Sequence, residues 1–191
     1  LMRYNVVKFK ISLKIRRIEM QSLKENFYRL LHPKIVFLLT SAGKEGKHNV
    51  MSCAWATPAS EEPPKVIVCL SKEHYTTELI KETQEFAINI PTKDMEKAIW
   101  ICGSKSGRNT DKFKEAGFKK ISASRVSAPL IEGCAGFIEC KVVKTIDAGE
   151  CYAFLADVVS AKADTKFFKK NLWLPDTVPM HLGGRKIVYF S

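Results

Sequence analysis

The chain has 191 residues, of which 46% are hydrophobic and 10% aromatic. Such a chain is long and apolar enough to fold as one globular domain, which excludes an intrinsically disordered protein. The formal net charge is +11, but outside residues 1–21 the excess forms no block and does not interleave with aromatic residues. We therefore predict anionic small-molecule ligands rather than nucleic acid. No membrane partner is expected either, because no apolar run approaches the ~20 residues of a membrane span.

Residues 1–19 form a basic extension to the predicted domain, which covers residues 20–191. Between residues 7 and 16 apolar and polar residues alternate strictly, which is typical of a strand. Two interpretations of this segment stay open. It is either an upstream piece that precedes a native start at Met20, which we favour, or a genuine edge strand.

The rest of the chain predicts strands that short helices interrupt. Ser22 and Glu25 form a capping box, which predicts a first helix through Leu31. Strands are expected at residues 34–41, 49–57, 65–71, 86–90, 135–146, 151–163 and around 180–190. Further helices are expected at residues 76–84, 92–102 and 111–116. Strands and helices do not alternate regularly, so we predict a mainly β fold with inserted helices, an antiparallel barrel.

The six cysteines show no C-x-x-C motif, and no Cys and His residues have zinc-finger spacing. Most of them lie in apolar, strand-like runs, as buried reduced thiols do. This pattern indicates a reducing, cytoplasmic environment and no metal site.

The loop that begins at Gly103, with the sequence GSKSGRNTDKF, combines small, hydroxylated and basic side chains in front of a helix. Its glycines let backbone N–H groups turn toward a ligand, Lys105 and Arg108 add charge, and Thr110 is the expected cap of a helix beginning at Asp111. Either an anion site or a solvated connector fits this pattern. The spacing is not that of a Walker loop, so the loop indicates a phosphate without naming the ligand that carries it.

Four segments carry a family resemblance, and they occur in the order NVMSCAWATPASEEPPKVIVCLS, YTTELIKETQEFAINIP, GSKSGRNTDKF and HLGGRKIVYF. The set resembles the flavin reductase-like, FMN-binding split-barrel family, which includes flavoredoxins and ferric reductases, over residues 22–191. The resemblance implies a Greek-key split barrel, a homodimer and one FMN per subunit near the dimer interface. It also implies hydride transfer from NADH or NADPH to N5 of FMN, and onward electron transfer to free flavin, ferric iron or a protein. The alternative is a flavoredoxin-like electron carrier that uses pyridine nucleotide poorly.

In the family, the segment that corresponds to residues 49–55 lies along the flavin ring. The expected ring contacts are therefore Asn49, Val50, Met51, Ser52, Cys53, Ala54 and Trp55. Most of these side chains are small or flexible, so the backbone can approach the polar edge of the ring. Trp55 offers a stacking wall, or else is an ordinary core tryptophan. Cys53 is interpreted as an inert packed thiol.

For the phosphate of that FMN, the residue types indicate two other segments, the turn that ends in a helix near residue 75 and the loop after Gly103. The expected contacts are Ser71, Tyr75, Thr76, Thr77, Ser104, Lys105, Ser106, Gly107 and Arg108. Hydroxyls and free N–H groups at a helix start suit a phosphate or the ribityl chain. The plainer interpretation is that Thr76 or Thr77 only caps the helix. Spacing does not decide whether Lys105 or Arg108 meets the phosphate.

His181 is the candidate catalytic residue, because it precedes two glycines in a segment similar to the family's ending near the flavin. Its expected role is to shape the nicotinamide pocket or to hydrogen-bond the reduced ring. The plainer interpretation is a histidine that packs the C-terminal turn.

Overall fold

The structure, a computed structural model, describes residues 20–23 and 25–190. The predicted extension 1–19, with the alternating segment 7–16, lies outside the described residues.

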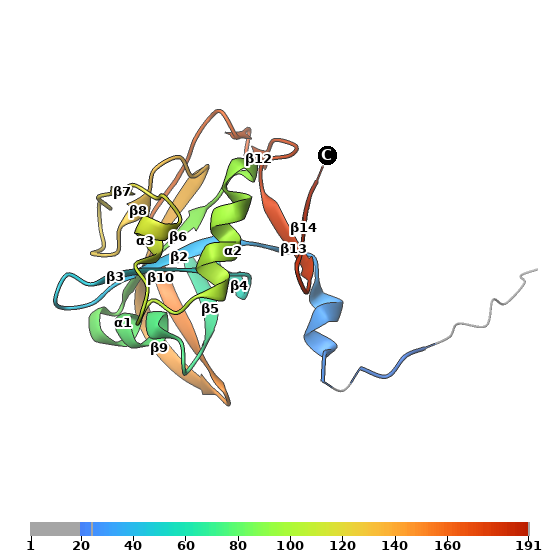
Figure 1. Cartoon of the computed structure of the whole chain (residues 1–191), viewed down its shortest axis with the longest axis horizontal. Coiled ribbons are helices and arrows are strands. Elements are labelled where there is room, and N and C mark those ends of the chain that lie inside the picture. The colour runs from blue at the N-terminus through green and yellow to red at the C-terminus, as the bar shows by residue number, and fades with distance from the viewer. Residues whose placement is uncertain (1–19, 24, 191) are drawn as a thin grey trace, which may run out of the picture.

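A seven-stranded antiparallel sheet dominates the fold (Figure 1). Its strands, in spatial order, are β3 (His48–Cys53), β2 (Phe37–Ala42), β6 (Glu85–Ile90), β9 (Gly136–Ala148), β10 (Cys151–Ala163), β5 (Lys65–Ser71) and β4 (Ala56–Ser60). The sheet curls into a split barrel whose edge strands, β3 and β4, follow each other in the chain. The predicted mainly β, antiparallel split barrel is confirmed.

The barrel core explains the strand patterns of the sequence. In β5, Val66, Val68 and Leu70 point into the barrel, and the residues between them are partly exposed. In β2 every residue is buried, because Leu39 faces the barrel core while Leu38 faces a second apolar layer outside it. The sequence of a strand that is covered on both faces is a continuous apolar run without alternation.

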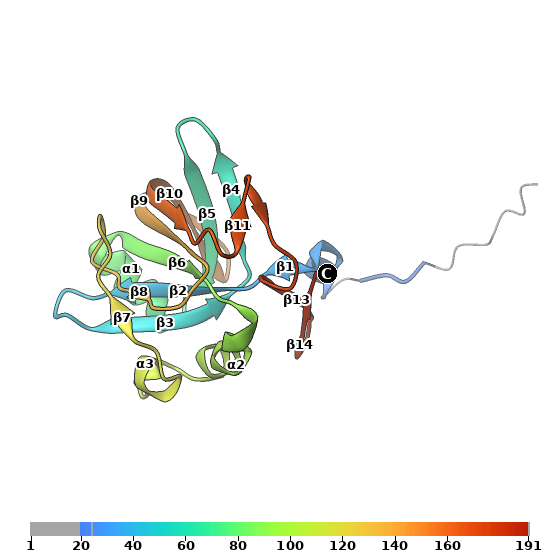
Figure 2. The ribbon, with the colours of Figure 1, turned by 90° about the horizontal axis from the view of Figure 1, so that it is seen from above.

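The helices that cover β2 and β3 form the second layer. They are α2 (Glu96–Ser104), which follows the 3-10 turn η2 (Lys93–Met95), and α3 (Lys112–Glu115). Helix α1 (Tyr75–Thr83) instead packs Ile80 into the barrel core. Figure 2 shows α2 and α3 side by side along β3. Ile99 of α2 and Phe113 of α3 pack against Val50 of β3 in this layer.

Two expected helix caps are wrong. Helix α1 has His74 at its N-cap, two residues before Thr76, and the Thr77 hydroxyl donates to the Ser71 carbonyl at 2.7 Å instead. Helix α3 is capped by Asp111, whose carboxylate accepts from the Lys114 N–H at 3.1 Å, and not by Thr110. A free side-chain carboxylate at the N-cap is at least as good an acceptor as a hydroxyl.

A three-stranded sheet beside the barrel pairs the first strand of the described chain with the last two (Figure 1). It consists of β1 (Lys34–Ile35), β13 (Pro179–Gly183) and β14 (Lys186–Tyr189). Before β1 lies a 3-10 helix, η1 (Phe27–Leu31). The prediction of a longer helix that starts at a capping box is therefore wrong. The apolar residues Phe27, Leu30 and Leu31 of η1 are exposed, and short helices without a packed face are marginal in water.

Two small hairpins complete the fold, β7 (Lys120–Ile121) with β8 (Leu130–Ile131) and β11 (Phe168–Lys169) with β12 (Leu172–Trp173). Among the described residues, no helix combines the length and the apolar character that crossing a membrane requires.

Candidate functional site

The loop after α2 faces the start of α1 across β3 and encloses a cavity of about 440 Å³, here called the loop cavity. Its lining residues are Asn49, Met51, Ser52, Glu73, His74, Tyr75, Thr76, Cys102, Gly103, Ser104, Lys105, Ser106, Gly107, Arg108 and Lys112. The segments predicted to hold a phosphate therefore lie around one space. The same space is lined by the first residues of the predicted ring-contacting segment.

The wall of the loop cavity is held together by Asn49. Its side-chain amide donates to the Thr76 hydroxyl at 2.8 Å, which ties β3 to the start of α1. The amide oxygen of Asn49 lies against Gly107, where an added Cβ would come within 2.0 Å of it. The loop approaches β3 this closely only because Gly107 has no side chain.

Two of the three lysine and arginine residues around the loop cavity are paired with carboxylates. Lys105 forms an ion pair with Glu115, and Arg108 forms one with Glu78. Arg108 also donates to the Glu73 carbonyl at 3.0 Å and covers the Tyr75 ring. These ion pairs connect the loop to α3 and to α1.

Lys112 differs from both, since only 4% of its surface is exposed. Its ammonium group donates to the Cys102 carbonyl at 3.3 Å, and none of the ion pairs formed by the described residues includes it. Burial lowers the pKa of Lys112.

A second cavity of about 880 Å³, here called the hairpin cavity, lies between β3, α2 and the β13–β14 hairpin. It is lined by Tyr28, His32, Val36, Ser52, Cys53, Ala54, Trp55, Lys97, Ile99, Trp100, Ile101, Gly103, Ser104, His181, Arg185 and Ile187. Ser52, Gly103 and Ser104 line both cavities, so the two spaces adjoin. The Ser52 hydroxyl donates to the Ile99 carbonyl at 2.5 Å and so joins β3 to α2 where the cavities meet.

Trp55 lies at the mouth of the hairpin cavity and is not a core residue, since 39% of its surface is exposed. Its ring packs against Tyr28, with ring centroids 5.6 Å apart, and the Lys34 ammonium group lies 5.2 Å from its centroid. Cys53, two residues earlier, is buried, and burial raises the pKa of its thiol to about 12. That thiol accepts the Trp55 N–H at 3.4 Å and stays protonated at neutral pH, as an inert packed cysteine does.

His181 lies on β13 in the wall of the hairpin cavity and contacts His32, with ring centroids 5.0 Å apart. Its Nε2 lies 2.8 Å from the Gly184 carbonyl, which only accepts, so Nε2 carries the proton. The carbonyl of His181 in turn accepts from Nδ1 of His32 at 3.1 Å. The imidazole of His181 thus holds the turn that leads to Arg185.

The structure does not bring every predicted residue to a cavity wall. Val50 and Thr77 are fully buried, and Ser71 accepts the Thr77 hydroxyl through its carbonyl. None of these three lines the loop or the hairpin cavity. The other predicted cofactor contacts and His181 line one cavity or both.

Sequence reasoning missed Lys112, His32, Lys97 and Arg185, all of which line the two cavities. A weak signal existed for two of them. Lys112 follows the cap residue directly inside a quoted motif, and Arg185 follows the glycine pair. His32 and Lys97 carry no such signal. His32 lies before β1 and Lys97 in α2, and only the fold brings them to the same cavity.

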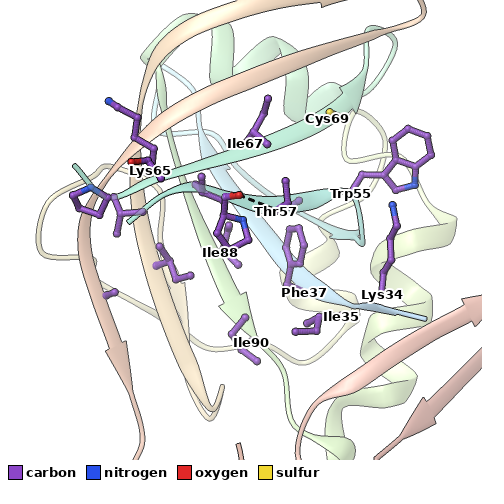
Figure 3. Close-up of a pocket in the computed structure, with 18 of the residues that line it drawn as sticks. Lys34, Ile35, Phe37, Trp55, Thr57, Lys65, Ile67, Cys69, Ile88 and Ile90 are labelled. Carbon is purple, nitrogen blue, oxygen red and sulfur yellow. Dashed lines mark hydrogen bonds between the residues drawn. The ribbon is translucent and has the colours of Figure 1, made fainter. Parts of the chain in front are cut away.

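A third cavity, of about 770 Å³, opens at the end of the barrel and shares Trp55 with the hairpin cavity. Figure 3 shows Lys34 beside Trp55 at one end of this barrel-end cavity and Lys65 at the other, with Phe37, Ile88 and Ile90 between them. Lys65 is paired with Asp157. The lining is otherwise mostly apolar, which the sequence did not indicate.

The loop cavity and the hairpin cavity together suit an elongated ligand with two chemically different ends. The smaller space offers hydroxyls, backbone groups and a buried ammonium, which an anionic group requires. The larger space offers apolar and aromatic walls for a flat ring system. The described residues form no group of three or more His, Cys, Asp or Glu side chains that could hold a metal ion.

Comparison with known proteins gives this arrangement a family. The profile of the flavin reductase like domain matches residues 28–179. Over 167 residues, 84% of this chain and 88% of the other, the sequence is 34% identical to the uncharacterized protein YddH of Escherichia coli K12. It is 26% identical over 132 residues to the flavin reductase (NADH) of Kitasatospora aureofaciens, which covers 67% of this chain and 65% of that one.

A solved structure agrees with these sequence matches. The flavoredoxin of Desulfovibrio vulgaris (Miyazaki F) superimposes with a TM-score of 0.79, covering 91% of this chain and 94% of that one at 26% identity. The structural similarity therefore covers most of this chain.

Proposed function

The chain belongs to the flavin reductase-like domain family, and we propose from its two adjoining cavities that it is an FMN-dependent NAD(P)H oxidoreductase. The observation that carries the proposal is that one cavity is polar and contains a buried cation, whereas its neighbour is apolar and aromatic. A phosphate in the loop cavity and a ring in the hairpin cavity account for both. FMN, when bound, supplies a ring that accepts hydride from a nicotinamide and passes electrons on.

The loop cavity fits the phosphate end of FMN in two respects. Tyr75 and Thr76, the first residues of α1, line the cavity, and the start of a helix favours an anion. The space is also small, about 440 Å³, and bordered by the loop around Gly107, which favours a monophosphate over the extended dinucleotide FAD. These features support FMN as the cofactor.

The mouth of the hairpin cavity supports a second, anionic substrate. Lys97 and Arg185 are exposed there, and the lining contains no Asp or Glu. The phosphates of NADH or NADPH match this charge. In this proposal His181 shapes the nicotinamide pocket by holding the turn that presents Arg185, and electrons leave to free flavin, ferric iron or a protein partner.

The similarity to a flavoredoxin supports an alternative, a carrier that holds FMN tightly and uses pyridine nucleotide poorly. We expect the purified protein to show flavin absorption bands in the visible region, and NADH or NADPH to bleach them under anaerobic conditions. Bands that dithionite bleaches but neither nucleotide does would favour the carrier. A protein that shows no flavin bands and takes up no added FMN would refute both.

The proposal includes a homodimer, supported by the barrel-end cavity and the apolar residues around it. Leu31 and Ile35 are 64% and 43% exposed at its rim, and Trp55 connects it to the hairpin cavity. A second subunit that covered these side chains would bury apolar surface beside the proposed ring site. All six cysteines are free thiols, which supports a reducing, cytoplasmic location.

A further inference from the structure

Lys112 is a buried lysine in the wall of the loop cavity. It is the first residue of α3, and 4% of its surface is exposed. Lysine is almost never fully buried in proteins unless its charge is paired. The partners of this side chain therefore need an explanation.

The described residues give Lys112 little compensation for its burial. Its Nζ donates to the Cys102 carbonyl at 3.3 Å, and its charge faces the Cys102 thiol, with His74 of the α1 cap also within electrostatic reach. An ammonium group has three N–H donors, so two are left for a ligand. A buried cation without a counter-charge is costly, and an anion that enters the cavity would remove that cost.

Packing imposes the inward direction of this side chain. The carboxylate of Asp111 accepts from the Lys114 N–H and so sets the start of α3. Phe113, the next residue after Lys112, is 4% exposed and packs in the layer between α3, β3 and α2. With Phe113 anchored there, Lys112 is buried and Lys114 is exposed.

The two bases that the sequence indicated are in a different situation. The side chains of Lys105 and Arg108 are 47% and 41% exposed, and each already contacts a carboxylate. A phosphate would have to compete with Glu115 or Glu78 and with water for them. Electrostatic attraction is much stronger in a buried wall than at such exposed positions.

We propose that Lys112 is the cation that binds the phosphate of FMN, an inference that rests on the proposed function. Lys105 and Arg108 instead close the loop over the cavity through Glu115 and Glu78. On this assignment Lys112 is the residue that makes the protein prefer FMN to riboflavin, which lacks the phosphate.

The test compares Lys112→Met with Lys114→Met, a matched control two residues away on the exposed side of α3. Flavin-free protein of the full chain is titrated with FMN and with riboflavin, and its thermal unfolding is measured with and without inorganic phosphate. In Lys112→Met the Kd of FMN should rise about 10- to 100-fold, the cost of a lost charge-assisted contact, while that of riboflavin stays within about twofold.

Stability provides the second readout. The flavin-free Lys112→Met protein should melt at the same or a higher temperature than the parent, because it no longer buries an unpaired charge. Inorganic phosphate should raise the melting temperature of the parent and of Lys114→Met, but not that of Lys112→Met.

Three outcomes would overturn the assignment of Lys112. They are an unchanged FMN affinity in Lys112→Met, an equal loss of FMN and riboflavin with a lower melting temperature, and a Lys105→Met variant that loses as much FMN affinity as Lys112→Met. The proposed function would survive them as long as the parent protein binds FMN. A parent that binds neither flavin would refute the proposed function, and the inference with it.

Discussion

At the scale of single residues, Gly107 sets the width of the loop cavity. The Asn49 side chain occupies the space where a Cβ of residue 107 would lie, and it is held there by its hydrogen bond to Thr76. Tyr75 closes the other side, 3.1 Å from the same point. Neither neighbour can move without loosening the start of α1.

Gly107→Ala should therefore weaken FMN binding by about tenfold or more, since the added methyl displaces Asn49 from Thr76 and loses roughly one buried hydrogen bond. Fluorescence titration of the flavin-free variant measures this. Gly103→Ala is the control in the same cavity wall. There the new Cβ would meet its nearest neighbour, the Cβ of Ser52, at an ordinary 3.4 Å, and alanine is the better helix former. Equal affinities in the two variants would contradict the role given to Gly107.

At the scale of elements, the pairing of β1 with β13 places two histidines in contact. Lys34 lies opposite His181 in the register, and His32 contacts His181 from the turn before β1. Nδ1 of His32 donates to the His181 carbonyl, while its Nε2 is buried without a hydrogen-bond partner among the described residues. Burial, His181 and the nearby charges of Lys34 and Arg29 lower the pKa of His32.

This lowered pKa predicts that the pairing of β1 with β13 is acid-sensitive. The unfolded chain, with a histidine pKa near 6.5, binds a proton before the folded protein does. The stabilising contribution of neutral His32 is thus complete above about pH 6.5 and is lost as the pH falls through the lower, folded pKa. Melting temperatures of the parent should fall between pH 7.5 and pH 5, and those of His32→Gln should fall less.

His48 and His74 also have pKa values lowered mainly by burial, so some acid sensitivity remains in the His32→Gln variant. The difference between variant and parent isolates His32. Identical acid-induced drops in melting temperature would show that His32 has the same pKa in the folded and the unfolded chain. The pairing of β1 with β13 would then play no part in the pH response.

At the scale of the whole molecule, the barrel has a covered side and an open end. Helices α2 and α3 cover the side along β3 (Figure 2), whereas the barrel-end cavity is open and mostly apolar. Ile35 and Trp55 at its rim are partly exposed. A monomer in water would keep this apolar surface hydrated, which the proposed second subunit would prevent.

Ile35→Glu should convert the proposed dimer to a monomer, because it introduces a charge into the apolar surface at the rim of the cavity. Light scattering coupled to size-exclusion chromatography measures the mass directly. Leu172→Glu is the control, since Leu172 is 69% exposed and does not line the cavity. A dimer that persists unchanged in Ile35→Glu would place the subunit contact elsewhere.

Most of the strands could be predicted because their signals are local. The alternation in β5 and the glycine turn between β9 and β10 report on residues within a few positions of each other. Helix ends were predicted less well. The N-cap of α1 is His74, two residues before Thr76, and that of α3 is Asp111, one residue after Thr110, where the carboxylate accepts the Lys114 N–H.

The sequence by itself determined the split barrel, the family and the segments that surround the two cavities, since ordered motifs and apolar periodicity are properties of the chain. Only the tertiary structure decided how those segments meet. Arg108 pairs with Glu78, thirty positions away, and His32 contacts His181 from the other end of the domain. Lys112 is buried because Phe113 is packed. Charge pairing and burial depend on neighbours that are distant in sequence. The basic residues of one motif therefore differ in pairing and exposure only in the folded protein, where Lys105 and Arg108 are paired and Lys112 is buried.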